Sequence, residues 1–402
     1  MDFLWVLMVF GTILFLGLSL LAIWAVYFHL SNTDIPPKVS QPFKLRVLHC
    51  LLIMLFGLVA VLKKMRLSNG YDILRSVMDG IPPGKDPHLS ITNLILDGLP
   101  VRMYQPRSPC DGRRRGILYF HGGIGLYGSV DAYERVCRHI AKNSNSLVAS
   151  VEYRLAPTNP YPTQFLDCLK AAVHFLKNVE DFGVDPASVI ICGDSSGGTL
   201  AAAVCQSLVS RPDLPKVRSQ ILIYPFLQGI DFNLPSYQRN GRMPLLSQRH
   251  VVEFGLQYLQ KDLALTSKAL KGFHMSKEKR LKYGKWLWPE KKPEELECED
   301  DAPTWPEESA DEVFEPTFSP LIAEDAVIRQ LPEMYILTCT ADVFMDDGCL
   351  YKKRLEDNGV KVTWYQLEDG FHGVVYFIDH CLFSFAGARL GLDSIVDYIK
   401  SL

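Results

Sequence analysis

The sequence predicts an α/β protein with a mostly parallel central sheet that helices flank on both faces. Two observations carry this expectation. Beyond about residue 90, short runs rich in β-branched residues alternate with stretches of helical spacing, and the strand-like runs are apolar throughout. Strands buried on both faces have this composition, because crossover helices cover both sides of a parallel sheet. A third observation, an uncharged apolar N-terminus, predicts a transmembrane helix ahead of this domain.

The composition is that of an ordinary folded protein and excludes several classes of function. Of the 402 residues, 48% are hydrophobic and 22% are charged, which excludes a disordered or low-complexity chain. With 42 basic and 45 acidic residues the net charge is −3, so nothing indicates a nucleic-acid partner. The ten cysteines form no C-x-x-C pair, and we expect no metal site.

The N-terminal segment predicts a membrane anchor over residues 1–30. No charged residue occurs from residue 3 to residue 28, and these 26 residues span about 39 Å as a helix, more than the ~30 Å hydrocarbon core. A cleaved signal peptide has a basic start and a shorter apolar run, so the alternative here is an unusually long signal peptide. The cations that follow the segment favour a cytosolic body by the positive-inside tendency; they are Lys38, Lys44 and Arg46.

Residues 31–90 are expected to form a linker and short helices. The paired prolines at 36 and 37 prevent helix continuation. A second apolar run covers residues 50–62 and is short for a membrane span. Its basic flanks leave two alternatives open, a buried helix of the soluble domain or a cap helix lying in the membrane interface.

The remaining segment, 91–402, is expected to be the catalytic domain. The predicted strands are residues 116–120, 147–153, 189–192, 220–224, 334–338 and 361–366, and the predicted helices are 132–143, 163–178 and 198–210. A charged insertion at about 268–315 has a basic half followed by an acidic half, with interleaved Trp286, Trp288 and Trp305. Charge blocks are usually solvated surface, but the tryptophans indicate packing, as a lid or against the membrane.

The strongest chemical signal is the hexapeptide G-D-S-S-G-G at 193–198, between an apolar strand and a helix-forming run. This is the context of a G-x-S-x-G nucleophile elbow, in which Ser195 is presented on a strained turn at a helix N-terminus. Glycines flank such a serine because the turn is crowded. The alternative is a tight turn with a capping serine, and no Lys-Ser/Thr follows that would cradle a phosphate.

A second signal, His121-Gly122-Gly123, directly follows the strand at 116–120. A loop of this type supplies backbone N–H groups to an oxyanion hole, and the residue after the nucleophile, Ser196, supplies the rest. Ile124 takes the fourth position, where a positive φ is unfavourable for a β-branched side chain. The alternative is an ordinary glycine-rich turn.

The third signal is an acid and a histidine late in the chain. Asp342 ends an expected strand, and His372 follows in a Gly-flanked loop, so the order Ser195, Asp342, His372 is that of a serine hydrolase triad. The rival base is His380, which we expect to be structural. The rival acids are Asp346, Asp347 and Asp369, the first two expected to cap the next helix.

Several motifs together carry a family resemblance along almost the whole chain. They are the His-Gly-Gly loop, Y-R-L-A-P at 153–157, the elbow, S-P-L at 319–321 and D-G-F-H-G at 369–373. With them the chain resembles the hormone-sensitive-lipase group of carboxylesterases. The N-terminal anchor and the run at 342–348 make it similar to the arylacetamide deacetylase-like branch.

This resemblance implies an α/β-hydrolase fold with a helical cap, and hydrolysis of carboxylic esters or arylamides without a cofactor. It implies Ser195 as nucleophile, His372 as base and Asp342 as orienting acid, with the oxyanion hole at His121, Gly122, Gly123 and Ser196. It further implies a small-molecule ester or lipid substrate. The location implied is the endoplasmic reticulum membrane, with a single-pass type II signal-anchor and a lumenal catalytic domain.

Two departures from the family pattern leave another function open. Ile124 replaces the usual fourth glycine, and Gly125 replaces the aromatic residue that follows it. A catalytically impaired homologue that binds a lipid or a partner is therefore the alternative to an active esterase. A nucleotide-binding protein would carry G-x-G-x-x-G or G-x-x-x-x-G-K-[ST] after a strand, and neither is found.

Overall fold

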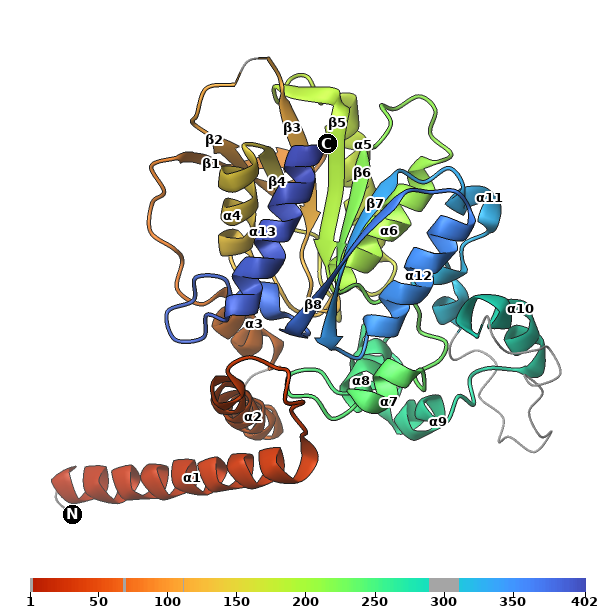
Figure 1. Ribbon diagram of the computed structural model, residues 1–402. Helices are drawn as coiled ribbons and strands as arrows, with labels where there is room; N and C mark the ends of the chain where they lie inside the picture. The colour runs from red at the N-terminus through yellow and green to blue at the C-terminus, as the bar shows by residue number, and fades with distance from the viewer. Residues whose placement is uncertain (1–2, 68–69, 111, 289–310) are drawn as a thin grey trace.

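The computed structural model describes residues 3–67, 70–110, 112–288 and 311–402, and its centre is an eight-stranded sheet (Figure 1). The strand order is β1-β2-β4-β3-β5-β6-β7-β8. From β4 to β8 all neighbours are parallel, whereas β1–β2 and β2–β4 pair antiparallel. The strands are β1 (Leu89–Leu96), β2 (Leu99–Pro106), β3 (Arg114–Phe120), β4 (Leu147–Val151), β5 (Val184–Asp194), β6 (Ser219–Ile223), β7 (Glu333–Ala341) and β8 (Val362–Phe371). The predicted mostly parallel sheet is confirmed.

Helices cover both faces of this sheet, as the apolar strands predict. On one face α4 (Glu134–Ser144) and α13 (Ala386–Ser401) pack together, and on the other lie α5 (Thr163–Lys177), α6 (Ser196–Leu208) and α12 (Met345–Asp357) (Figure 1). Each layer has its own apolar core, which explains why the β3 side chains are buried on both sides: Leu118 belongs to one core and Tyr119 to the other.

Three N-terminal helices precede the sheet: α1 (Phe3–Asn32), α2 (Pro42–Lys64) and α3 (Tyr71–Asp79). Among the described residues α1 and α2 are the helices long and apolar enough to cross a membrane, by length and composition alone. Most of α1 is exposed, and its second half packs on α2. The run expected over 50–62 belongs to the C-terminal part of a longer helix, α2, which buries Leu48 and Ile53 and exposes Leu51 and Phe56. One side of α2 is thus buried in the domain, and the other side is apolar and exposed. The membrane-interface alternative stays a prediction.

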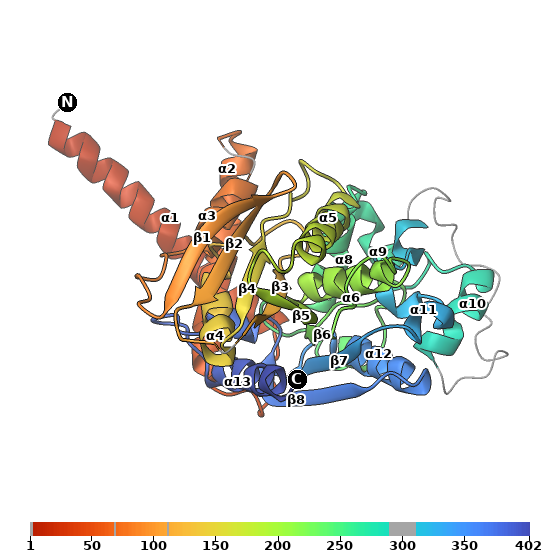
Figure 2. The same ribbon diagram turned by 90° about the horizontal axis from the view of Figure 1, so that it is seen from above.

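The segment between β6 and β7 adds further helices. α7 (Pro235–Arg239), α8 (Gln248–Tyr258) and α9 (Thr266–Leu270) lie below the strand ends in Figure 1, and α10 (Lys277–Leu287) lies at the side, next to α12. α11 (Asp325–Ile328) comes just before β7. Within the charged insertion Trp286 lies 3.9 Å from the Arg354 guanidinium, and the Trp288 indole donates to Asp231 at 2.8 Å. These tryptophans pack beside α12, on the opposite side of the molecule from α1 (Figure 2). Trp305 lies outside the described residues.

Candidate active site

Ser195 lies at the sharp turn between β5 and α6, with φ +54° and ψ −123°. Its N–H donates to the Ile223 carbonyl at 2.9 Å, which ties the turn to β6. The flanking glycines are required by crowding: a Cβ at Gly193 would collide with the Gly197 carbonyl, and one at Gly197 with the Phe120 carbonyl. Backbone therefore packs on backbone around the strained serine.

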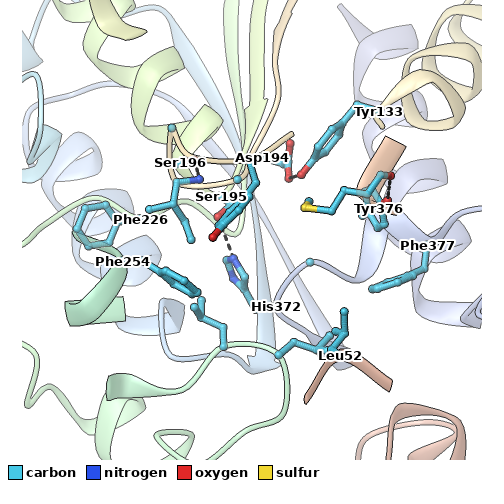
Figure 3. A pocket seen from close by; sticks show the side chains of 18 of the residues that line it. Leu52, Tyr133, Asp194, Ser195, Ser196, Phe226, Phe254, His372, Tyr376 and Phe377 are labelled. Carbon is cyan, nitrogen blue, oxygen red and sulfur yellow. Dashed lines mark hydrogen bonds between the residues drawn. The ribbon is translucent and has the colours of Figure 1, made fainter. Parts of the chain in front are cut away.

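The three residues predicted to act together do meet at the carboxyl ends of the strands, and Figure 3 shows Ser195 beside His372. Ser195 Oγ lies 2.9 Å from His372 Nε2, and His372 Nδ1 lies 2.8 Å from Asp342 Oδ2. Asp342 directly follows β7 and His372 directly follows β8. The parallel register of the sheet explains this convergence of residues far apart in the sequence, because carboxyl ends of parallel strands share one edge.

The surroundings of His372 hold its ring in one orientation. The rings of Tyr224 and Phe344 lie edge-on to the imidazole, with centroids at 5.0 and 4.9 Å. Asp342 is buried, and its second carboxylate oxygen accepts the Phe344 N–H at 2.9 Å. A carboxylate held in this way keeps the Nδ1 proton in place and leaves Nε2 as the acceptor.

Two of the rival acids, Asp346 and Asp347, bind backbone groups away from His372. Asp346 and Asp347 lie in the first turn of α12, but their carboxylates do not cap it: Asp346 accepts the Ser236 N–H at 2.7 Å and Asp347 the Leu227 N–H at 2.9 Å. The expected capping role is thus replaced by contacts that tie α12 to the segment after β6. Burial raises the pKa of the Asp347 carboxyl to about 7. The rival base His380 lines the edge of the cavity, beside Tyr376.

The glycine loop after β3 is tied to the elbow by Asp194. Its Oδ1 accepts the Gly122 N–H at 2.9 Å and the Tyr119 hydroxyl at 2.8 Å, and its Oδ2 accepts the Tyr133 hydroxyl at 3.0 Å. Burial raises the pKa of this carboxyl to about 6, although these hydrogen bonds act in the opposite direction. Because its N–H donates to Asp194, Gly122 helps to hold the loop in position. It does not offer the free N–H group that the sequence predicts for an oxyanion hole.

His121 likewise supports the loop. The imidazole is buried, stacks between Tyr133 and Tyr153, and donates from Nδ1 to the Gly122 carbonyl at 2.8 Å. Burial lowers the pKa of His121 to about 4, so the ring is neutral near pH 7. Of the four predicted hole residues, His121 and Gly122 thus support the loop, and the other two are left as candidate backbone donors.

Those two donors are the N–H groups of Gly123 and Ser196, which donate to no other group in the described part of the chain. Both residues line the cavity beside Ser195. Ile124 takes φ +65°, the left-handed region that the sequence marks as unfavourable for it. Its N–H donates to Ser196 Oγ at 2.7 Å, so a side chain holds this strained peptide.

Tyr258 explains the second departure, at Gly125. A Cβ on Gly125, at φ +67°, would lie 2.5 Å from the Tyr258 ring. The ring of an α8 residue thus fills the space next to the loop. The supporting residues Asp194, Tyr133 and Tyr258 were missed by sequence reasoning. Only Asp194 had a signal, as the acid within the elbow motif.

A cavity of about 800 Å³ opens from Ser195 toward the N-terminal helices. Its wall is largely aromatic and aliphatic, with Phe226 and Phe254 on one side and Tyr376 and Phe377 on the other (Figure 3). Cavities of this size and polarity are typical small-molecule sites. Across the residues that the structure describes, no three His, Cys, Asp or Glu side chains gather to hold a metal ion.

A serine on a strained turn between a central parallel strand and a helix is the defining feature of the α/β hydrolases. Ser195, between β5 and α6, has this position. Comparison with known proteins gives the family. The family profile described as α/β hydrolase fold matches residues 117–282 and 297–376. Arylacetamide deacetylase-like 4 of Homo sapiens is 40% identical over 97% of both chains, and arylacetamide deacetylase of Bos taurus is 36% identical over 86% of this chain and 90% of its own.

Among solved structures, an esterase of Pyrobaculum calidifontis is 25% identical, with a TM-score of 0.59 over 82% of this chain and 88% of its own. The chain belongs to the α/β hydrolase fold family, in its arylacetamide deacetylase-like group.

Proposed function

We propose that this chain is a membrane-anchored serine hydrolase that cleaves carboxylic esters of small molecules or lipids, with arylamides as a second substrate class. The observation that carries the proposal is the pair of contacts from Ser195 Oγ to His372 Nε2 and from His372 Nδ1 to Asp342, at 2.9 and 2.8 Å. The names of the relatives, an arylacetamide deacetylase and an esterase, point to the same chemistry.

In the proposed mechanism Ser195 Oγ attacks the acyl carbon while His372 Nε2 takes the hydroxyl proton. The carbonyl π bond opens, and the negative charge on its oxygen is stabilised by the N–H groups of Gly123 and Ser196. His372 then returns the proton to the departing alcohol oxygen as the carbon–oxygen bond breaks. A water molecule repeats the sequence on the acyl-enzyme, which releases the acid and restores Ser195.

The purified full chain tests this with a short-chain acyl ester. We expect turnover that Ser195→Ala lowers by at least about a thousandfold, because a triad nucleophile has no substitute. The matched control is Ser207→Ala on the same helix α6, where the hydroxyl only donates to the Ala203 carbonyl, and it should retain activity. Turnover that survives Ser195→Ala would refute the proposal.

The second candidate function is the impaired homologue, and the observation that favours it is Ile124 in a left-handed conformation within the oxyanion loop. A fluorophosphonate probe separates the two, since it reacts with an activated serine without needing a particular substrate. Failure to label the folded protein would favour the binding role.

For location we propose that α1 is a single-pass type II anchor in the endoplasmic reticulum membrane, with the catalytic domain in the lumen. The exposed apolar length of α1 supports an anchor, and the family resemblance supports the lumenal side. The cations after α1 favour the cytosolic side instead. Protease treatment of intact microsomes decides: a protected catalytic domain supports the proposal, and a digested one overturns it.

A further inference from the structure

The outer wall of the catalytic cavity is made of apolar side chains that are also exposed. Leu51 and Phe56 of α2 are 47% and 44% exposed, Ile81 after α3 is 84% exposed and Leu382 after β8 is 77% exposed, and all four line the cavity. The cavity therefore has its mouth between α2 and the segment 379–385. Exposed apolar patches of this kind mark surfaces that contact a ligand, another protein or a membrane.

This mouth is continuous with the apolar surface of the N-terminal helices. Gly57 of α2 faces Leu21 and Trp24 of α1, so the two helices are in direct contact. Most other large apolar side chains of α1 are exposed, as are Phe43, Val47, Leu58 and Val61 of α2. The cavity mouth and the helix pair thus form one apolar face of the molecule. The two helices, α1 and α2, lie at the lower left in Figure 1.

Cations stand at the edges of this face. Lys44 donates to the Ser384 carbonyl at 2.7 Å and Arg135 to the Ile81 carbonyl at 2.9 Å, which places both beside the mouth. Lys63 and Lys64 end α2 and are exposed. An apolar surface with basic residues along its border suits a lipid bilayer, whose acyl region meets the apolar side chains and whose phosphates meet the cations.

We propose that the cavity opens directly into the bilayer, and that the substrates are long-chain lipid esters that enter laterally between α2 and the segment 379–385. The chemistry at Ser195 rests on the proposed function, but the route does not. The acyl chain passes from the membrane along Leu51, Leu382 and Phe56 to the serine without crossing water. The bilayer is the occupant of the apolar face.

One long-chain fluorogenic ester, presented in two ways to the full-length protein, tests the route. It is embedded in phosphatidylcholine vesicles in one assay and delivered as a cyclodextrin-bound monomer in the other. We expect Leu382→Asp, and separately Leu51→Asp, to lower kcat/KM on vesicles at least tenfold more than on the monomer. The matched control is Leu390→Asp in α13, a leucine 51% exposed that does not line the cavity, and it should leave both rates unchanged.

Equal losses in the two presentations would show that the mouth only binds acyl chains, and would overturn the membrane route. Vesicle rates unaffected by either variant would overturn it as well. Failure of the proposed function looks different, because the unmodified protein would then leave a short-chain acyl ester intact as well. Turnover of the short-chain ester with none of the long-chain ester in either presentation would overturn the long-chain substrate class instead. Fluorophosphonate labelling of each variant at the unmodified rate confirms that the site is folded.

Discussion

The elbow around Ser195 and the loop at 121–125 both force a non-glycine residue into positive φ, but they hold it differently. Ser195 donates its N–H to the Ile223 carbonyl of the neighbouring strand, and backbone atoms crowd it on both sides. Ile124 donates its N–H to the Ser196 hydroxyl. Strain at Ser195 is thus held by the sheet itself, whereas strain in the loop at 121–125 depends on one side chain. Substitutions should therefore be severe in the elbow and graded in the loop.

Gly197→Ala should have the largest effect on stability. The new Cβ would meet the Phe120 carbonyl, and because that oxygen belongs to β3 the sheet or the turn must shift. We expect a loss of about 4 kcal/mol in the free energy of unfolding, at the severe end of single substitutions. Urea denaturation measures this loss, and a cost below about 1 kcal/mol would show that the elbow is not crowded as described.

The next effect is a pH dependence from His121, whose pKa burial lowers to about 4. Between pH 4 and pH 6.5 the unfolded chain binds a proton there that the folded chain does not, so stability falls as the pH falls through this window. At about 1.4 kcal/mol per pKa unit, the whole effect is about 3 kcal/mol.

The neutral variant His121→Gln removes this dependence. From pH 7 to pH 4 the unmodified protein should therefore lose about 3 kcal/mol more than the variant, as measured by denaturation at each pH. The raised pKa of Asp194 contributes with the opposite sign, but in both proteins, so it cancels in the difference. Parallel stability curves would mean that His121 is protonated in the folded state.

Gly125→Ala tests a position that is crowded by a side chain, whereas Gly197 is crowded by backbone atoms. Its Cβ would meet the Tyr258 ring, which can rotate aside, and alanine at φ +67° adds strain. We expect a loss of about 2 kcal/mol, clearly less than at Gly197. An equal or larger loss at Gly125 would remove the distinction between the two loops.

Ser196→Ala should have the smallest effect, about 1 kcal/mol, from the lost acceptor of the Ile124 N–H. In an Ile124→Gly background the loss should be less than half as large, because glycine accepts positive φ without help. The double-mutant cycle measures this coupling. Equal costs in both backgrounds would show that Ser196 does not hold the strained peptide.

The parallel sheet and the meeting of Ser195, Asp342 and His372 could be predicted from the sequence, because apolar runs and the order of motifs can be read from it directly. It failed at the edge of the sheet. Only the two end residues of β1, Leu89 and Leu96, are buried, and Ser90, Thr92 and Asn93 interrupt its apolar residues, so no long apolar run marks it. The Asp97-Gly98 turn, with φ +50° and +82°, was the available signal for this hairpin.

Supporting contacts within the site could not be predicted either. Asp194 accepts the Gly122 N–H, and Tyr258 fills the space at Gly125. Both contacts join segments that only tertiary packing brings together. The same holds for Asp346 and Asp347, whose position in a first helical turn suggested capping although their partners come from after β6. A sequence motif shows which residues are neighbours along the chain, whereas these roles depend on which residues are neighbours in the folded structure.

The central claim is that His372 activates Ser195 as a nucleophile, and mapping of a fluorophosphonate adduct by mass spectrometry tests it most directly. We expect one adduct, on the peptide that contains Ser195, formed at a rate that His372→Gln lowers by at least about a hundredfold. An adduct on another residue, or labelling of Ser195 that is unchanged in His372→Gln, would contradict it.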